Sequence, residues 1–562
     1  MKTHKITRQK AGESAVILLL STVFVKIIGA AFKIPLASNL FLGDLGFGYF
    51  SVAYDLFTPF YVLAISGLPA ALSNIIAEFL AQKRYNDIEK TFLLTKKLFL
   101  IFGIISSLIF SVLAIPFVKF TDTSGNTLYS VYAVIPSVFL CFLISSYRGY
   151  YEGFADMNPT AISKIIEAFG KLFLGLGFAF AVIKITSNPA FAAGGAMLGI
   201  SIGTLVSTIY LKFRYKFGAK LISSQDLAQS PLAITNNKTV KLILMLSLPV
   251  ALSSLISSAV SLIDALTVRS ILNANIEDLF LKNKQAIEYF NSVSNTTISE
   301  SNFATYLYGI RSKAFTLFNL VPTLTMSLGV AALPTLSYFW SKKDISLVKK
   351  NFNAIIKMIS LITLPAGIAF IAVSPYIMKL LYSDYGSVNI GGKLLLIYGF
   401  SAIFAGFSIP LTSVLQSFNA QFKALFNILI GTIIKIISNI VLVSIPSINI
   451  YGAAISTSVC YLYILLAHIY RINKIIGKTG EFKNIIIKPL LASIVSSACA
   501  LIICKIFDAK IGIICGIIVA VIAYMVVLVI FKALTEDDFD NIPKGKKLYF
   551  WAKKFKIMQN TC

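Results

Sequence analysis

Nine charged side chains interrupt otherwise apolar stretches of this 562-residue sequence. Six of them are basic and three are acidic: Lys26, Lys33, Lys171, Arg311, Lys313 and Lys435, against Asp55, Glu167 and Asp264. The apolar stretches are about 20 residues long, the length that a helix needs to cross hydrocarbon. A charge in mid-membrane costs about 2.5–3.5 kcal/mol unless a partner or a cavity relieves it. The surplus of positive charge therefore predicts a cationic cavity that binds an anion.

The best candidates for substrate contact in that cavity are Lys26, Lys33, Arg311 and Lys313. Lys26 and Lys33 are seven residues apart, so they share one helix face about two turns from each other. Arg311 comes from the other half of the chain, and two bundles around a central cavity would bring it near Lys26. Lysine and arginine match phosphate well, which favours a phosphate-bearing substrate. The simpler alternative for Lys33 and Lys313 is that each amine snorkels to the membrane interface.

A second group of charged residues is predicted to line the cavity or to couple transport to an ion. Its members are Asp55, Arg148, Glu167, Lys171, Asp264 and Lys435. Glu167 and Lys171 have the i, i+4 order that favours an ion pair along a helix, which is a structural role.

Other chemistries lack their residues. The sequence has only His4 and His468, so a histidine metal centre or acid–base centre is not expected. Its six cysteines have no metal or disulfide spacing. The tripeptide at 477–479, Gly-Lys-Thr, lacks the earlier glycine of a phosphate-binding loop, because Ile472 stands there. We expect no metal, no cofactor and no enzyme activity; a coupling ion, Na+ or H+, stays open.

The composition sets the class of protein. Hydrophobic residues make up 57% of the chain and charged residues 13%, about half the charge of a soluble domain. No soluble fold can cover so much apolar surface, so a soluble enzyme is excluded. The net charge of +26 alone does not indicate a nucleic-acid binder. The basic, aromatic segment 544–556 is expected to lie on anionic lipid beside a membrane span.

The chain is predicted to be an all-α polytopic membrane protein with about 14 transmembrane helices. The first apolar run has no cleavage site and is taken as a retained span. The fourteen spans are expected at about 15–37, 48–80, 92–115, 127–147, 160–183, 190–211, 242–268, 305–340, 354–374, 394–416, 424–444, 450–470, 485–504 and 511–531.

The distribution of lysine and arginine gives the orientation. With the N-terminus inside, alternate segments between spans hold 35 of these residues on the inner side and 9 on the outer side. Because cytoplasmic loops carry the excess of lysine and arginine, both termini are predicted to be cytoplasmic.

The two halves of the sequence resemble each other. Three pairs of segments align at offsets of 261, 264 and 257 residues: 71–92 with 332–352, 152–171 with 416–435, and 195–214 with 452–471. Six spans therefore repeat as six spans, and two C-terminal spans lie outside the repeat, an organisation typical of transporters. The predicted parts are a cytoplasmic tail (1–14), an N-lobe (15–216), a linker (217–241), a C-lobe (242–471, with an outer loop at 270–304), spans thirteen and fourteen (472–534) and a basic cytoplasmic tail (535–562).

Five segments carry a resemblance to a known family. They are VKIIGAAFKIPL (25–36), LGDLGFGYF (42–50), GLPAALSNIIAEF (67–79), YRGYYEGFADMNPTAISKIIE (147–167) and LGVAALPTLS (328–337). The sequence resembles the multidrug/oligosaccharidyl-lipid/polysaccharide (MOP) exporter superfamily over nearly its whole length. Within it, the chain is most similar to the MurJ-like lipid II flippases, including the stage V sporulation protein B branch.

The resemblance implies a V-shaped pair of six-helix bundles that alternates between inward-open and outward-open states. It implies a groove at the last two spans for a polyprenyl tail. By motif matching, Lys26 and Lys33 stand where these flippases carry cavity arginines, and Arg311 matches the arginine of the eighth span. Asp55 stands where some relatives have a basic residue, and Ile310 where many have an acid. These departures bear on which lipid-linked glycan is carried, not on the class.

The implied protein is a monomeric flippase in the cell membrane of a bacterium. Its partners would be membrane lipids and a lipid-linked anionic glycan, exported with help from the membrane potential. One alternative is a cation-coupled drug or metabolite exporter of the same superfamily, which would favour an acidic surplus within the spans. Another is a membrane-embedded glycosyltransferase or polymerase, for which only the loop at 270–304 offers acids.

Overall fold

A computed structural model describes residues 11–121, 124–218, 221–231, 236–282, 284–293, 298–477, 483–507, 509–531 and 533. These residues form helices and no strands, which confirms the all-α prediction. Contacts divide the chain into two units, Met1–Ser312 with Val443–Ile450, and Lys313–Leu442 with Tyr451–Cys562. Both chain ends, 1–10 and 534–562, lie outside the described residues, so the orientation of the termini and the V-shape stay predictions.

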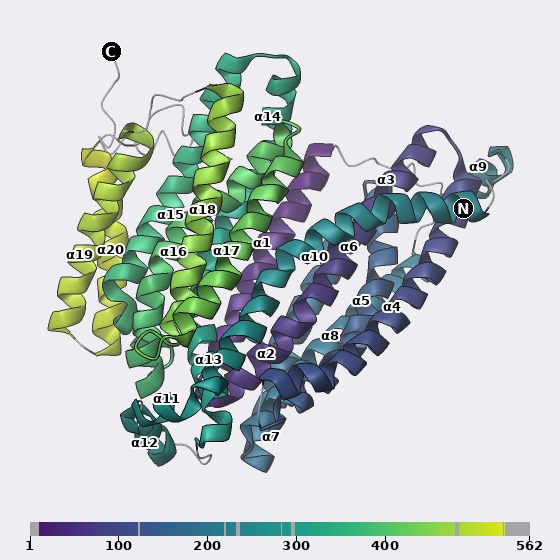
Figure 1. The fold of residues 1–562 in the computed structure, drawn as a ribbon. Coiled ribbons are helices and arrows are strands. Elements are labelled where there is room, and N and C mark those ends of the chain that lie inside the picture. The colour runs from purple at the N-terminus through teal and green to yellow at the C-terminus, as the bar shows by residue number, and fades with distance from the viewer. Residues whose placement is uncertain are drawn as a thin grey trace. The chain divides into compact units, whose positions relative to one another are not determined.

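The first unit holds the helices of the first half and the start of the second (Figure 1). They are α1 (Ala11–Leu36), α2 (Gly43–Val62), η1 (Leu63–Gly67, a π-helix), α3 (Leu68–Ala81), α4 (Tyr85–Thr121), α5 (Thr127–Gly153), α6 (Asn158–Gly170), η2 (Lys171–Gly175, a π-helix), α7 (Leu176–Thr186), α8 (Pro189–Phe217), α9 (Ser224–Gln229), α10 (Asn236–Ala274), α11 (Ile276–Lys282), α12 (Lys284–Val293) and most of α13 (Glu300–Phe318).

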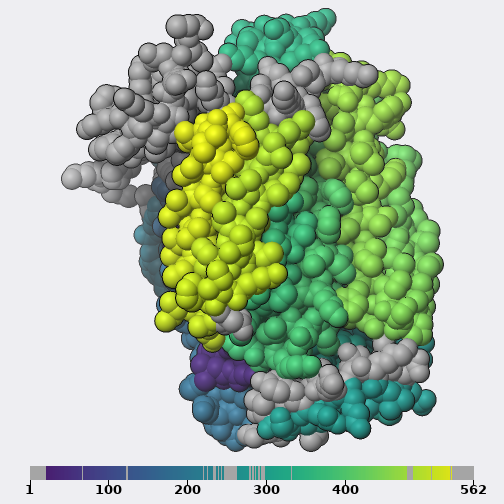
Figure 2. All heavy atoms as spheres, turned by 90° about the vertical axis from the view of Figure 1, so that its left-hand side faces the viewer, coloured from purple at the N-terminus to yellow at the C-terminus, as the bar shows by residue number. Residues whose placement is uncertain are grey.

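The second unit holds the remaining helices, which lie side by side in Figure 1. They are α14 (Leu320–Ser341), α15 (Ile345–Leu381), α16 (Tyr385–Ser417), α17 (Gln421–Ser444), α18 (Tyr451–Ile476), η3 (Lys483–Ile487, a π-helix), α19 (Lys488–Ile506) and α20 (Lys510–Ile530). Figure 2 shows α19 and α20, in yellow, packed against each other and on α15. The Tyr524 hydroxyl donates to the Leu361 carbonyl at 3.1 Å and ties α20 to α15.

Small residues bring neighbouring helices of the first unit into close contact. A Cβ on Gly170 would lie 2.4 Å from Gly203 Cα, and a Cβ on Gly199 would lie 2.4 Å from Gly175 Cα. Membrane helices use such small residues to let backbones approach, because van der Waals packing drives their association. The kinked segment α6–η2–α7 is therefore held along α8, and Lys171 begins the π-helical turn.

The contact between α2 and α13 is equally close. A Cβ on Gly309 would lie 1.8 Å from the Asp44 carbonyl oxygen, and a Cβ on Gly48 would lie 2.2 Å from the Thr305 carbonyl oxygen. Only glycine fits at either position. The first part of α13 is thereby fixed to α2, which explains why the division between the two units falls inside α13.

The seventh predicted span also packs on the first half. Helix α10 contacts α2, α3, α4 and η1, so the first contact unit extends beyond the linker at 217–241. The lobes drawn from the sequence repeat remain a prediction. The predicted outer loop at 270–304 contains α11 and α12 among its described residues.

The predicted number of fourteen spans is not confirmed. In the described part of the chain, eleven helices are long and apolar enough to cross a membrane, or twelve when a bent pair counts as one span. That pair, Glu300–Val330 with Thr335–Ser341, is bent by 40°. Helices α1 and α10 stand outside this count, although they lie where the first and seventh spans are predicted.

Backbone geometry repeats at the spacing of the sequence repeat. Eight residues of positive φ fall into four pairs: Lys83 and Lys343, Gly125 and Ser383, Ala155 and Asn419, and Ser187 and Asn449. The members of a pair are 258 to 264 residues apart, close to the offsets found between the sequence segments. Because a left-handed residue marks a specific kind of turn, the two halves turn at corresponding places.

Candidate functional site

Two lysines of α1 make no ion pair with any carboxylate of the described residues. Lys26 is exposed and Lys33 is partly buried. The Lys33 amine lies 4.1 Å from the ring centre of Tyr54 on α2, a cation–π contact. Lys26 interacts electrostatically with Tyr54, Lys33 and Lys171. Three lysines therefore surround one phenol, and this part of the first unit is strongly positive.

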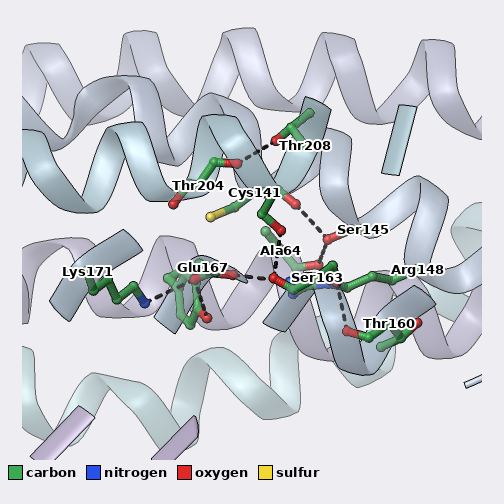
Figure 3. A network of polar contacts seen from close by, with 12 residues as sticks. Ala64, Cys141, Ser145, Arg148, Thr160, Ser163, Glu167, Lys171, Thr204 and Thr208 are labelled. Carbon is green, nitrogen blue, oxygen red and sulfur yellow. Dashed lines mark hydrogen bonds and ion pairs between the residues drawn. The ribbon is translucent and has the colours of Figure 1, made fainter. Parts of the chain in front are cut away.

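A buried ion cluster holds the third of these lysines (Figure 3). Glu167 of α6 pairs with Lys171 at 3.0 Å and with Arg148 of α5 at 3.1 Å. Its Oε1 also accepts the Tyr61 hydroxyl at 3.0 Å, and Arg148 Nε donates to Ser163 Oγ at 2.9 Å. The predicted pair Glu167–Lys171 is confirmed. One carboxylate thus balances two cations, which leaves the cluster with a net positive charge.

Arg148 lies deeper than its assignment to a cytoplasmic segment at 148–164 implied. Helix α5 continues to Gly153, and the Arg148 side chain is 2% exposed. The count of loop charges misplaced it because the sequence around it, with several tyrosines and glycines, resembles the end of a span. The motif at 147–167 was the better signal for this residue.

A second network surrounds Arg311. Arg311 of α13 pairs with Asp264 of α10, and both side chains are almost fully buried. The guanidinium carbon lies 5.1 Å from the ring centre of Tyr308, whose hydroxyl donates to Asp55 Oδ2 at 2.7 Å. Asp55 also interacts electrostatically with Arg311 and Lys33. Lys33 therefore lies within range of both networks, and all of these residues belong to the first unit.

The structure places Lys313 and Lys435 apart from this group, in the second unit. The Lys313 amine is fully buried, pairs with Asp384 at 3.0 Å and donates to Ser387 Oγ at 3.1 Å. It also lies 4.8 Å from the ring centre of Tyr382. Lys435 is fully buried on α17. A buried ion pair is strongly destabilised when one partner is removed, so this environment of Lys313 suits a structural role.

Two further buried charges were not recognised in the sequence. Asp384 precedes α16 directly and supplies the carboxylate for Lys313. Arg269 was assigned to an outer segment, but α10 continues to Ala274, and its buried guanidinium donates to the Thr305 hydroxyl. A signal was present: Arg269 follows Asp264 by five residues, a spacing more typical of a continuing helix than of a loop.

Metal sites and histidine chemistry find no support among the described residues. They contain no group of three or more histidine, cysteine, aspartate or glutamate side chains that could hold a metal ion. His468 is buried, and one ring nitrogen lies 3.2 Å from the Ser408 carbonyl oxygen. The polar networks of the first unit are thus built from lysine, arginine, carboxylates and phenols.

Comparison with known sequences agrees with this chemistry. The profile of a family described as polysaccharide biosynthesis protein matches residues 11–340, more than half of the chain. The chain belongs to this family. A second profile, MatE, matches residues 310–441. These matches confirm the resemblance to the MOP superfamily, and the protein is a multi-span membrane transporter of that superfamily.

Individual relatives and solved structures cover most of the chain. Stage V sporulation protein B of Bacillus subtilis is 25% identical over 96% of this chain and 98% of its own length. The lipid II flippase MurJ of the same organism is 24% identical over 88% of each chain. An inward-facing MATE-family multidrug transporter superimposes with a TM-score of 0.63 at 14% identity, covering 82% of this chain and 98% of its own. An inward closed structure of MurJ gives 0.61 at 16% identity, covering 92% and 98%.

Proposed function

We propose that this transporter is a flippase that moves a polyprenyl-diphosphate-linked glycan precursor across the cytoplasmic membrane by alternating access. The supporting observation is the set of lysines around Tyr54, in which Lys26 and Lys33 have no carboxylate partner among the described residues. A diphosphate brings several negative charges, which water stabilises in the cytoplasm and which hydrocarbon does not. Lysine amines replace part of that hydration while the lipid tail stays in the membrane.

The three cations of the proposed site have different parts in this mechanism. Lys26, which is exposed, is available to bind a phosphate directly, and Lys33 adds a second amine on the same face of α1. Arg311 is held by Asp264, so it contributes a fixed positive field unless the substrate displaces that carboxylate. No bond is made or broken in the substrate, so no catalytic residue is assigned.

The names of the relatives support the choice of substrate class. One relative is a lipid II flippase and another is a sporulation protein, both from a bacterium. For this chain we propose a bacterial membrane location with both termini in the cytoplasm, action as a monomer, and partners limited to lipids and the lipid-linked glycan. Export of an anion from an inside-negative cell gains about 2.3 kcal/mol per charge per 100 mV, so the membrane potential supplies a driving force.

The test is transport by purified protein in liposomes. A fluorescent lipid-linked diphosphate precursor should cross the bilayer with the wild-type chain, and it should not cross with Lys26→Ala or Arg311→Ala. Both variants should insert and keep the wild-type melting temperature in detergent. Wild-type rates in both variants would refute the cationic site. Complementation of a strain depleted of its own flippase would then identify the glycan.

A second candidate is a cation-coupled exporter, favoured by the MatE profile and by the buried carboxylate of Asp55. Such a protein would transport organic cations in exchange for Na+ or H+. The liposome assay distinguishes the two, because an imposed Na+ or proton gradient would drive uptake of a cationic dye only in the exporter.

A further inference from the structure

A cavity of about 730 Å³ lies in the second unit, between the turn that joins α14 to α15 and the turn that joins α16 to α17. Its lining is mostly polar and consists of Ser337, Trp340, Ser341, Lys343, Ile345, Ser417 and Asn419. None of these residues takes part in the charged networks above. The cavity is therefore a separate feature that the proposed transport does not use.

The backbone around this cavity has a counterpart in the first half. The bonds that close the turns recur at offsets of 260 and 264 residues: Arg84 N–H to Phe79 O (2.9 Å) and Asp344 N–H to Phe339 O (3.2 Å), then Asp156 N–H to Tyr151 O (3.1 Å) and Ala420 N–H to Leu415 O (2.9 Å). The helices also end at these offsets, α3 and α14 at Ala81 and Ser341, α5 and α16 at Gly153 and Ser417. The two halves can therefore be compared position by position.

The side chains at these positions differ in one consistent way. Polar residues of the second half replace small apolar residues of the first: Ser337 for Ala77, Ser341 for Ala81, Ser417 for Gly153 and Asn419 for Ala155. The lysine is common to both halves, as Lys83 and Lys343, with φ of 56° and 57°. Four hydrogen-bonding side chains have thus been placed around one lysine in the second half only.

Packing supports the same contrast. In the first half, a Cβ on Gly153 would lie 2.6 Å from Ile76 Cβ, so α5 lies directly against α3. In the second half, Ser417 occupies that position, and Ser337 Oγ donates to the Ser417 carbonyl at 3.4 Å. A serine at 417 cannot allow the approach that glycine allows at 153.

The cavity lies at the level where the second unit leaves the membrane. Candidate spans end at Ser341 and Ser417, and the next spans begin at Ile345 and Gln421. Trp340, whose ring centre lies 5.1 Å from that of Phe418, is the kind of residue that anchors helices at the lipid–water interface. Tyr338 on the same helix is 53% exposed, as expected beside lipid.

The available groups fit a phosphate ester. Lys343 makes no ion pair with a carboxylate of the described residues, because the adjacent Asp344 caps α15 by accepting the Leu347 N–H at 3.0 Å. Lys342 lies 4.5 Å from the Tyr338 ring centre and adds positive charge on the same turn. Basic side chains near a membrane surface attract anionic lipid by about 1 kcal/mol each, and serine hydroxyls and an asparagine amide donate to phosphate and glycerol oxygens.

We propose that this cavity binds the phosphate-bearing headgroup of an anionic glycerophospholipid, with Lys343 on the phosphate and Ser341 and Asn419 on the remaining oxygens. The bound lipid fastens the ends of α14 and α16 at the membrane surface. The site is absent from the first half because Ala81 and Ala155 offer no donors there.

The experiment is native mass spectrometry of the full chain in detergent, titrated with phosphatidylglycerol, with phosphatidylcholine and with inorganic phosphate. The site variant is Lys343→Asn with Ser341→Ala. Its matched control is Lys83→Asn, at the equivalent left-handed turn, since asparagine tolerates that backbone. A second variant, Asn419→Ala, introduces the residue that the first half carries with the same backbone.

Phosphatidylglycerol should bind the wild-type chain about tenfold more tightly than phosphatidylcholine. The site variant and Asn419→Ala should each weaken it, the former about tenfold, whereas Lys83→Asn should stay within about twofold. Equal weakening by Lys343→Asn/Ser341→Ala and Lys83→Asn would overturn the proposal. So would full displacement of the lipid by millimolar inorganic phosphate, which would make the cavity a site for free phosphate. Transport of the glycan precursor is measured separately, so failure here leaves the proposed function untouched.

Discussion

Lys171 and Lys435 occupy corresponding positions of the two halves, 264 residues apart, in opposite surroundings. Lys171 pairs with Glu167, which also holds Arg148. At the positions corresponding to Glu167 and Arg148, the second half has Gly431 and Thr412. A Cβ on Gly431 would lie 2.5 Å from Ile464, so α17 packs where a glutamate would not fit. The same lysine is thus kept in an ion cluster in one half and in a tightly packed helix contact in the other.

This difference teaches that the halves have diverged in what they do with charge. The Lys171 side chain is 18% exposed and interacts with Lys26, whereas Lys435 is fully buried. In the sequence alignment of the first and seventh spans, Leu252 and Ala259 stand where Lys26 and Lys33 do. The first half therefore concentrates cations for an anionic substrate, and the second half does not.

The largest effect should come from the two α1 lysines. Lys26→Ala with Lys33→Ala should abolish transport of the lipid-linked precursor in liposomes, because both partly solvated amines are lost from the anion site. Folding should change by less than about 0.5 kcal/mol, since neither amine pairs with a described carboxylate. Lys184→Ala, at the end of α7, serves as the control. Substantial transport by the double variant would break the assignment of the first half.

Glu167→Gln should cost about 3–5 kcal/mol of stability, because it leaves two buried cations without their carboxylate. Thermal unfolding in detergent measures this loss. Adding Lys171→Met to Glu167→Gln should restore part of it, since one of the stranded charges is then removed. An unchanged melting temperature for Glu167→Gln would mean that the ion cluster contributes nothing to the fold.

Gly153→Ser should destabilise the first unit by about 1–3 kcal/mol, because the added side chain meets Ile76. The reverse change, Ser417→Gly in the second half, should cost less than about 1 kcal/mol, the usual effect of glycine near a helix end. Chemical or thermal unfolding of both variants compares the two positions directly. Similar losses for both would show that the two contacts are packed alike.

The smallest expected effect separates Lys171 from Lys435. Lys171→Met should slow transport about tenfold, equivalent to about 1.4 kcal/mol, by lowering the positive potential near Lys26. Lys435→Met should change the rate by less than about twofold. The liposome assay gives both numbers, and a larger defect in Lys435→Met would reverse the functional ranking of the halves.

Much of this architecture could be predicted from the sequence, because hydrophobic length and charge placement are local properties. The helical membrane class, the repeat and the Glu167–Lys171 pair all follow from spacing along one chain. Span ends were harder, because helices continue past the last apolar residue. Arg148 and Arg269 were for that reason assigned outside the spans, although their partners bury them.

The partners of buried charges could not be predicted. Asp264 for Arg311 and Asp384 for Lys313 come from helices or turns 47 and 71 residues away. Nothing in local spacing chooses such a carboxylate, because tertiary packing decides which side chains meet. The excess of positive charge counted in the sequence was consequently too broad: among the substrate candidates, Lys26 and Lys33 are the ones without a described carboxylate partner.

The division of the chain inside α13 has a consequence for biosynthesis. The first unit requires residues up to Ser312, held to α2 through Gly48 and Gly309, and it also includes Val443–Ile450. A ribosome that has made only the first repeat has therefore not yet made all the parts of the first unit. Although the halves arose as copies in sequence, severing the gene at the linker should yield two fragments that cannot mature separately and must be co-expressed.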